Sequence, residues 1–225
     1  MDTGNDYRFI MAEYAVSRLK QRVRQWGMPW PLNKSKALEI IESLERDVKK
    51  LRYSYLPPEL LLESETLKEL TSKSKELATL VLPKQQVKME QKHRLALSEI
   101  KWALSILIGL HNRIKLGAAN HPVYAVDVVG VEVTRVTPLE GTDNLKVTRA
   151  STGSIVFTIV TNIQDIKPGE VRAAALLPPV EFHGVISEAM YSSDPLPREL
   201  IGKRVPRKYL SGELSGKILS ILGKR

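Results

Sequence analysis

The chain of 225 residues contains no cysteine, which excludes disulfide bonds and metal sites built from thiolates. Its longest strongly apolar run, residues 102–110, is far shorter than the stretch of about 20 residues that a membrane-spanning helix needs. The first ten residues also lack the apolar core of a secretory signal. We therefore expect a cytoplasmic protein without a membrane partner.

Motifs of enzyme and cofactor chemistry are absent as well. The chain has no glycine-rich phosphate loop or dinucleotide fingerprint, and its four histidines do not stand at metal-ligand spacing. His183 and Ser187 are four residues apart, with Asp194 after them, but no nucleophile elbow or glycine frame accompanies them. We therefore predict a protein that is not an enzyme and that binds no nucleotide, other cofactor or metal.

The chain does carry an excess of positive charge, with a formal net charge of +9. Counting lysine and arginine against aspartate and glutamate gives +7 for residues 1–120, −4 for residues 121–197 and +6 for residues 198–225. Much of the affinity of proteins for nucleic acid comes from neutralised phosphates. A polyanion is therefore the expected partner, and the two flanking regions would supply most of the phosphate contacts.

The first 120 residues have the apolar spacing of four amphipathic helices. The expected helices cover residues 6–26, a stretch capped by Asn33 or Ser35 that ends before residue 57, a stretch from Pro58 to about residue 80, and residues 85–116. Short connections favour an antiparallel bundle or a pair of helical hairpins. The first helix carries four cations that form either a solvated face or a strip that contacts phosphates: Arg18, Lys20, Arg22 and Arg24.

Residues 118–122 have the small, polar composition of a linker, and the apolar period then changes from that of helices to that of strands. We expect a long first strand with a bend at Gly130, and a turn at residues 167–170 between antiparallel strands. Three of the five expected strands lie at about residues 126–136, 145–151 and 155–160, and two more lie around the apolar bursts at residues 171–177, 180–182 and 185–186. Five short strands in this order predict an OB-fold barrel.

The predicted fold class is therefore α+β with several domains. A basic helical domain would cover residues 1–120, and an OB-fold β-barrel would cover residues 121–197. A basic C-terminal extension, residues 198–225, would pack on the barrel.

Three segments in the barrel region match the motifs of a known family in order and spacing. They read Thr-Asp-Asn-Leu at residues 142–145, Ile-Val-Thr-Asn-Ile at 159–163 and Pro-Val-Glu-Phe-His-Gly-Val-Ile-Ser-Glu-Ala-Met at 179–190. Residues 124–193 thereby resemble the tRNA-binding domain of the endothelial monocyte-activating polypeptide type, which is also appended to some methionyl- and phenylalanyl-tRNA synthetases. Relative to the family pattern, Asn144 replaces a lysine, His183 an arginine and Ala189 a glycine.

The resemblance implies that Ser187 and Met190 lie beside a bound nucleic acid, although both also fit a buried strand. His183 would keep the hydrogen-bonding capacity of the arginine but not its permanent charge. Phe182 and Tyr191 would either stack on bases or belong to the core. The full set of candidate nucleic-acid contacts is Asn144, Lys146, Asn162, His183, Ser187, Met190, Arg204, Arg207 and Lys208.

Two functions fit these observations. The first is a non-catalytic protein that binds tRNA through the barrel, with phosphate contacts from the basic helices and tail. The alternative is an assembly module that associates with an aminoacyl-tRNA synthetase or with itself as a homodimer, its RNA binding weakened or lost. The acidic barrel and the replaced basic residues favour the alternative.

Overall fold

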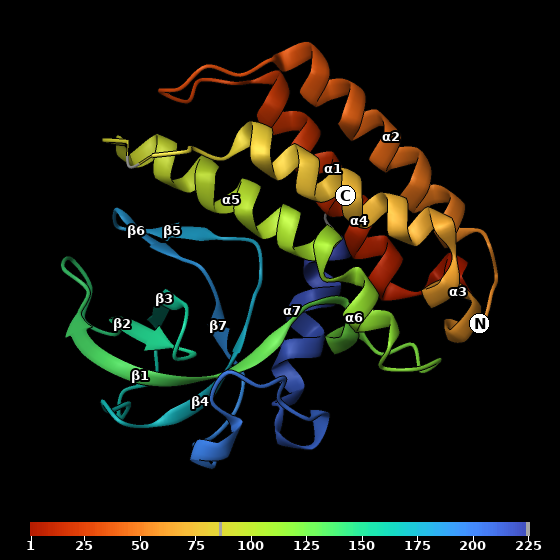
Figure 1. Ribbon diagram of the computed structural model, residues 1–225. Coiled ribbons are helices and arrows are strands. Elements are labelled where there is room, and N and C mark those ends of the chain that lie inside the picture. The colour runs from red at the N-terminus through yellow and green to blue at the C-terminus, as the bar shows by residue number, and fades with distance from the viewer. Residues whose placement is uncertain (86, 224–225) are drawn as a thin grey trace. The chain divides into compact units, whose positions relative to one another are not determined.

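The computed structural model describes residues 1–85 and 87–223 (Figure 1). The chain divides into two compact units, one formed by residues 1–126 with the last residues from Ile221, and the other by Asp127–Ser220. The first is helical and the second is built on a curled sheet, so the predicted α+β class with several domains is confirmed. The predicted domain boundaries after residues 120 and 197 stay predictions. Residue 86 of the predicted fourth helix and residues 224 and 225 of the predicted extension lie outside the described residues.

Four long helices build the first unit: α1 (Tyr7–Arg24), α2 (Lys34–Arg52), α4 (Glu65–Val81) and α5 (Gln91–Ile108). Helix α1 packs against α2 and α5, and α4 packs against the same two helices. The buried apolar side chains recur at helical spacing, so each helix turns one stripe to a common core. Short elements complete the unit: η1 (Thr3–Asn5), α3 (Pro58–Glu63), α6 (Leu110–Ile114) and η2 (Pro122–Ala125).

Two predicted helices are each broken in two. The helix expected from Pro58 to about residue 80 stops at Ser64, whose backbone is extended and whose hydroxyl accepts a hydrogen bond from the Leu67 amide at 3.3 Å, which caps α4. The helix expected over residues 85–116 begins only at Gln91, and Gly109 separates α5 from α6. The apolar spacing continues across both breaks, and one serine or glycine inside a periodic run is a weak stop signal.

A buried ion pair ties the beginning of α1 to the end of α6. Asp6 caps α1 and accepts hydrogen bonds from the Arg8 amide at 2.9 Å and from the Arg8 guanidinium at 2.6 Å, and both side chains are fully buried. The same guanidinium donates to the carbonyl oxygens of Arg113 at 3.1 Å and Gly117 at 2.8 Å. The partners around this cation offset the cost of burying it.

The second unit is a five-stranded antiparallel sheet in the order β3-β2-β1-β4-β7, curled into a half-barrel (Figure 1). Its strands are β1 (Val128–Pro138), β2 (Lys146–Ser151), β3 (Val156–Thr161), β4 (Val171–Ala175) and β7 (Met190–Tyr191). The inner face carries a compact apolar core that includes Val131, Val133, Ala150, Ile159 and Ala174. The predicted barrel-like β domain is therefore confirmed.

The strands around residues 180–191 differ from the prediction of two. β5 (Val180–Phe182) and β6 (Val185–Ser187) form a separate two-stranded sheet, and β7 follows as a further short strand. The hairpin turn at His183 and Gly184 lies between the two apolar bursts, residues 180–182 and 185–186, that the sequence shows.

The turn at residues 167–170 forms as predicted, with Gly169 at φ +89° and the Glu170 amide donating to the Lys167 carbonyl at 3.3 Å. The strands on either side, β3 and β4, run antiparallel as predicted, but they do not pair with each other, because β2 and β1 lie between them. The turn instead contacts β1, where Val133 exchanges two hydrogen bonds of 2.8 Å with Gly169 and Glu170. Turn chemistry is local, whereas strand order depends on the whole sheet.

The tail that follows β7 adds to the free side of β1. The Gly130 amide donates to the Lys203 carbonyl at 2.9 Å, and the Gly130 carbonyl accepts from the Gly202 amide at 2.8 Å. A Cβ on Gly130 would lie 2.0 Å from the Leu200 carbonyl oxygen. Glycine is thus required by the close approach of the tail backbone rather than by the bend that we expected. The short turns η3 (Arg198–Leu200) and η4 (Arg207–Tyr209) belong to this tail, and α7 (Gly212–Gly223) follows.

Replacing Gly130 with alanine should therefore destabilise the β unit by about 1–3 kcal/mol or more, because backbone atoms must move apart to admit the methyl group. Thermal unfolding followed by circular dichroism measures the effect. Gly216→Ala in α7 is the matched control, since a Cβ there meets nothing within 4 Å. The control should gain about 0.5–1 kcal/mol. Equal free energies of unfolding for the two variants would contradict the close approach of Leu200 to Gly130.

Candidate nucleic-acid interface

A hollow of about 840 Å³ opens on the β unit. Its walls come from the end of β3, from β7 with the residues that follow it, and from the tail between Lys208 and Glu213. Three aromatic side chains belong to its lining: Phe182, Tyr191 and Tyr209. A concave surface lined by aromatic and polar residues is suited to hold a flat ligand that forms hydrogen bonds.

Three of the predicted contacts line this hollow. Asn162 is exposed just beyond β3, and Met190 is half-buried in β7. Lys208 is exposed, and its Nζ lies 4.9 Å from the centre of the Tyr209 ring. The exposed Tyr209 itself was not among our predicted contacts, although its place directly after Arg207 and Lys208 is a signal that could have found it.

Two further predicted contacts, Asn144 and Lys146, are joined to Asn162 through Gln164. The Gln164 side-chain amide donates to the Asn144 carbonyl at 2.8 Å and to the Asn162 carbonyl at 3.0 Å. The Lys146 Nζ donates to the Gln164 carbonyl. Gln164 was missed by sequence reasoning because it acts on backbone oxygens, which leave no trace in the spacing of side chains. These groups form one polar rim at the junction of β2 and β3.

His183 lies at the tip of the β5–β6 hairpin. It has φ +45° and Gly184 has φ +80°, the pair of left-handed residues that a two-residue type I′ turn requires. Its Nδ1 would lie 3.4 Å from a Cβ built on Gly141. The imidazole therefore sits beside the loop between β1 and β2, the loop that also carries Asn144.

Two other predicted contacts are engaged inside the β unit. Ser187 is only 7% exposed, and its Oγ accepts a hydrogen bond from the Val160 amide at 3.0 Å and donates to the Ala189 carbonyl at 3.0 Å. Arg204 forms an ion pair with Asp127 at 3.1 Å.

Arg207 is exposed on η4, next to Lys208. Of the cations predicted in the tail, Arg207 and Lys208 are the ones turned to solvent.

The charge around the hollow is mixed. The lining includes four carboxylates: Asp165, Glu170, Asp194 and Glu213. It includes two cations: Arg172 and Lys208. Arg172 is buried, paired with Glu170 at 2.9 Å and donating to the Ser193 carbonyl at 3.1 Å. Its charge is thus used within the unit. The hollow suits contacts to bases better than contacts to phosphates, and Lys208 with Arg207 marks the side open to a polyanion.

Tyr191 belongs to the core rather than to the exposed surface. Its hydroxyl lies 2.9 Å from the Thr148 Oγ1, which also donates to the Ile159 carbonyl at 2.9 Å. Burial raises the pKa of the Tyr191 phenol to about 12. Of the two aromatic residues that we considered for stacking, the half-buried Phe182 is therefore the one that remains accessible.

The Tyr191 phenol should ionise about two pH units above its ordinary value of 10.0. Because an unfolded chain ionises first, the stability that this group contributes is complete below pH 10 and is lost as the pH rises towards about 12. The ultraviolet phenolate titration of the intact chain, minus that of Tyr191→Phe, isolates the group. A difference signal centred near pH 10 would contradict the burial of its hydroxyl.

Within the part of the chain that the structure describes, the helices are too short or too polar to cross a membrane. The same residues contain no group of three or more histidine, aspartate or glutamate side chains placed to hold a metal ion.

Comparisons with known proteins find similar solved structures and one family. The solved structure titled "Crystal structure of MetRS related protein from Pyrococcus horikoshii" is 26% identical over 37% of this chain and 92% of that chain, with a TM-score of 0.34. No curated protein matches the chain. A family model described as an alpha helical domain matches residues 1–117, more than half of the sequence and the whole of α1 to α6. The chain therefore belongs to the alpha helical domain family.

Proposed function

We propose that the chain is a non-catalytic RNA-binding protein, with tRNA as its expected ligand, and that its β unit is an OB-fold of the tRNA-binding type. The observation that carries the proposal is the hollow on the β unit. Asn162, Met190 and Lys208 from the predicted set line it, and Asn144 and Lys146 adjoin Asn162 at its rim. The sequence resemblance to the tRNA-binding domain supports the same reading, since it covers these segments.

Each wall of the hollow has a distinct task in this proposal. Phe182 and Tyr209 stack on unpaired bases, each contact being worth about 1–3 kcal/mol. The side-chain amides of Asn144 and Asn162 at the rim hydrogen-bond to base edges or ribose hydroxyls, while Gln164 holds the two residues together. Lys208 and Arg207 contact phosphates. Folded RNA hides most base edges in a deep groove, so a site of this kind takes loop bases and reads the shape of the backbone.

The proposal predicts salt-dependent retention of unfractionated tRNA on filters. Affinity should fall steadily between about 50 and 200 mM salt, because each phosphate contact releases counterions. Tyr209→Ala should weaken the affinity for tRNA by about 1–3 kcal/mol through the lost stacking. Tyr53→Ala, which alters an exposed tyrosine of the helical unit, is the matched control and should bind as the unaltered chain does. Absence of retention at low salt would rule out the proposal.

The assembly module remains a second candidate because of one specific feature. Three large apolar side chains are exposed on β3 and β5 or directly beside them: Ile155, Val156 and Val180. β3 is also the edge strand of the five-stranded sheet. Thr158 and Val160 already bond to Glu188 and Ser187 along this edge, so the exposed apolar side chains, and not free backbone groups, are what favours contact with another protein. The partner in this case would be an aminoacyl-tRNA synthetase or a second copy of the chain.

If this edge mediates self-association, Ile155→Ser combined with Val156→Ser should convert a dimer to a monomer in sedimentation experiments. The reason is that the substitutions remove apolar surface from the edge while leaving the buried core intact. Sedimentation of the unaltered chain and of a Val147→Ser variant provides the comparison, since Val147 lies on β2, inside the sheet. A monomeric unaltered chain would exclude the homodimer but not a synthetase partner.

A further inference from the structure

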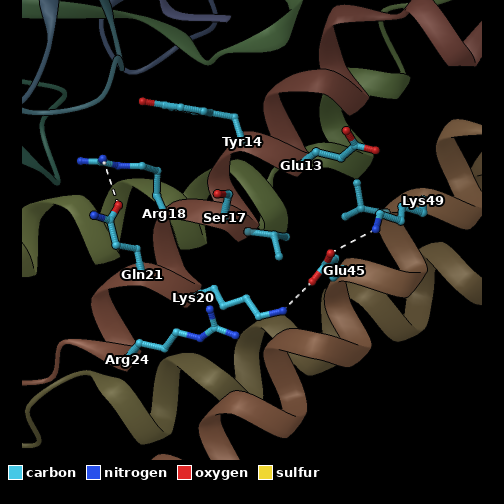
Figure 2. Close-up of a pocket in the computed structure, with 11 residues that line it drawn as sticks. Glu13, Tyr14, Ser17, Arg18, Lys20, Gln21, Arg24, Glu45 and Lys49 are labelled. Carbon is cyan, nitrogen blue, oxygen red and sulfur yellow. Dashed lines mark hydrogen bonds and ion pairs between the residues drawn. The ribbon is translucent and has the colours of Figure 1, made fainter. Parts of the chain in front are cut away.

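A groove of about 580 Å³ runs between α1 and α2 in the helical unit (Figure 2). The α1 side contributes Glu13, Tyr14, Val16, Ser17, Arg18, Lys20, Gln21 and Arg24, and the α2 side contributes Glu45, Val48 and Lys49. This groove lies outside the interface described above. The balance of cations and carboxylates along the groove determines which class of ligand it can bind.

The predicted strip of four cations on α1 does not act as one surface. Arg18 and Arg22 both form ion pairs with Glu99 of α5, whose side chain is almost entirely buried. These two guanidinium groups therefore neutralise an internal carboxylate and hold α1 against α5. Only Lys20 and Arg24 of the strip are left to consider as contacts for an external anion.

Lys20 shares its carboxylate partner with Lys49. Their ammonium groups lie 2.9 Å and 3.1 Å from opposite oxygens of Glu45 (Figure 2). Hydrogen bonds from Lys20 and then Lys49 lower the pKa of Glu45, so this carboxylate is ionised near neutral pH. Glu42 is a further, looser partner of Lys20 at 3.9 Å, so two lysines face two carboxylates here and their charges balance.

Two more cations stand where α1 stops and α2 begins: Arg24, which lines the groove, and Lys34 beside it. The Arg24 side chain is exposed and has no hydrogen-bond or ion-pair partner among the described residues. The exposed Lys34 donates to the Arg24 carbonyl at 2.6 Å, which leaves its charge unneutralised. Lys34 is also the first residue of α2, and the first turn of α2 holds no acid. A cation at a helix N-terminus opposes the helix dipole, so helix stability does not account for it.

We propose that this groove binds the phosphate backbone of an RNA strand, with Arg24 and Lys34 supplying the unneutralised charge and Lys20 a further hydrogen-bond donor to the phosphates. The inference rests on the proposed RNA-binding function and assigns to it a second contact surface. Lys20 and Arg24 are one helical turn apart, about 6 Å along the axis, so they can meet different phosphates. Figure 2 shows both side chains extending from α1 on the same side. Ser17 and Gln21 add groups that hydrogen-bond to ribose or phosphate oxygens.

An acidic protein segment fits the groove less well than RNA. Protein partners are anchored mainly by apolar and aromatic side chains that fill pockets. The apolar residues at the floor of this groove offer almost no surface, since Val16 is 2% exposed and Val48 is fully buried. Besides the half-buried ring of Tyr14 and the aliphatic stems of its long side chains, the groove presents charge and hydrogen-bonding groups, which suits a sugar–phosphate chain.

The test uses the full chain and a fluorescein-labelled single-stranded RNA of mixed sequence at about 50 mM salt. Arg24→Glu combined with Lys34→Glu should lower the affinity on the order of tenfold or more and reduce the salt dependence of binding. Glutamate is favourable at the start of α2, so we expect the variant to fold. The matched control, Lys75→Glu with Lys101→Glu, makes the same charge change at exposed positions on α4 and α5.

Equal affinity of the groove variant and the control would overturn the groove as an RNA site, while binding by the unaltered chain would keep the RNA-binding function. Failure of the unaltered chain to bind any RNA at this salt concentration would overturn both. Labelled poly-glutamate is then the second probe. Its binding to the unaltered chain, with loss in the groove variant alone, would identify an acidic protein segment as the occupant and so reject RNA.

Discussion

The approach of the tail backbone to β1 at Gly130 is the constraint on which the geometry of the β unit depends. Leu200 lies so close that no side chain fits at that position, and the tail hydrogen-bonds to both polar groups of the glycine. From this anchor the tail continues to η4 and supplies the third wall of the hollow, including Lys208 and Tyr209. A backbone contact within the sheet thus determines whether the candidate interface exists at all.

Internal ion pairs decide how much of the net charge is available to a ligand. Glu99 takes two arginines of α1, Asp127 takes Arg204, and Glu170 takes Arg172. These cations stabilise the fold and are largely neutralised before any polyanion arrives. The cations that remain stand at the ends of elements, as Arg24 and Lys34 do in the helical unit and Arg207 and Lys208 do in the tail. Counts of charge along the sequence overstate the electrostatic attraction for this reason.

Periodicity was sufficient to predict the helical region, the first three strands and the fold class, because apolar spacing reports directly on which face is buried. The breaks at Ser64 and Gly109 escaped it because each depends on backbone geometry at one residue. Strand order escaped it because order is set by contacts between distant segments.

The candidate site, too, was predictable where it depends on side-chain spacing and not where it depends on backbone contacts. Motif spacing located Asn144 and Asn162, but Gln164, which ties them together, acts only through backbone oxygens.

The position of Ser187 has a consequence for how such sequences are read. Its hydroxyl bridges the β3 backbone and the segment before β7, and Glu188 repeats the bridge by exchanging two bonds of 2.9 Å with Thr158. Ser187, the serine of the family signature at residues 179–190, therefore holds the curled sheet closed. A serine at this position is therefore required by the fold. Its presence in a sequence indicates that the sheet closes in this way, and it does not by itself indicate that a ligand is bound.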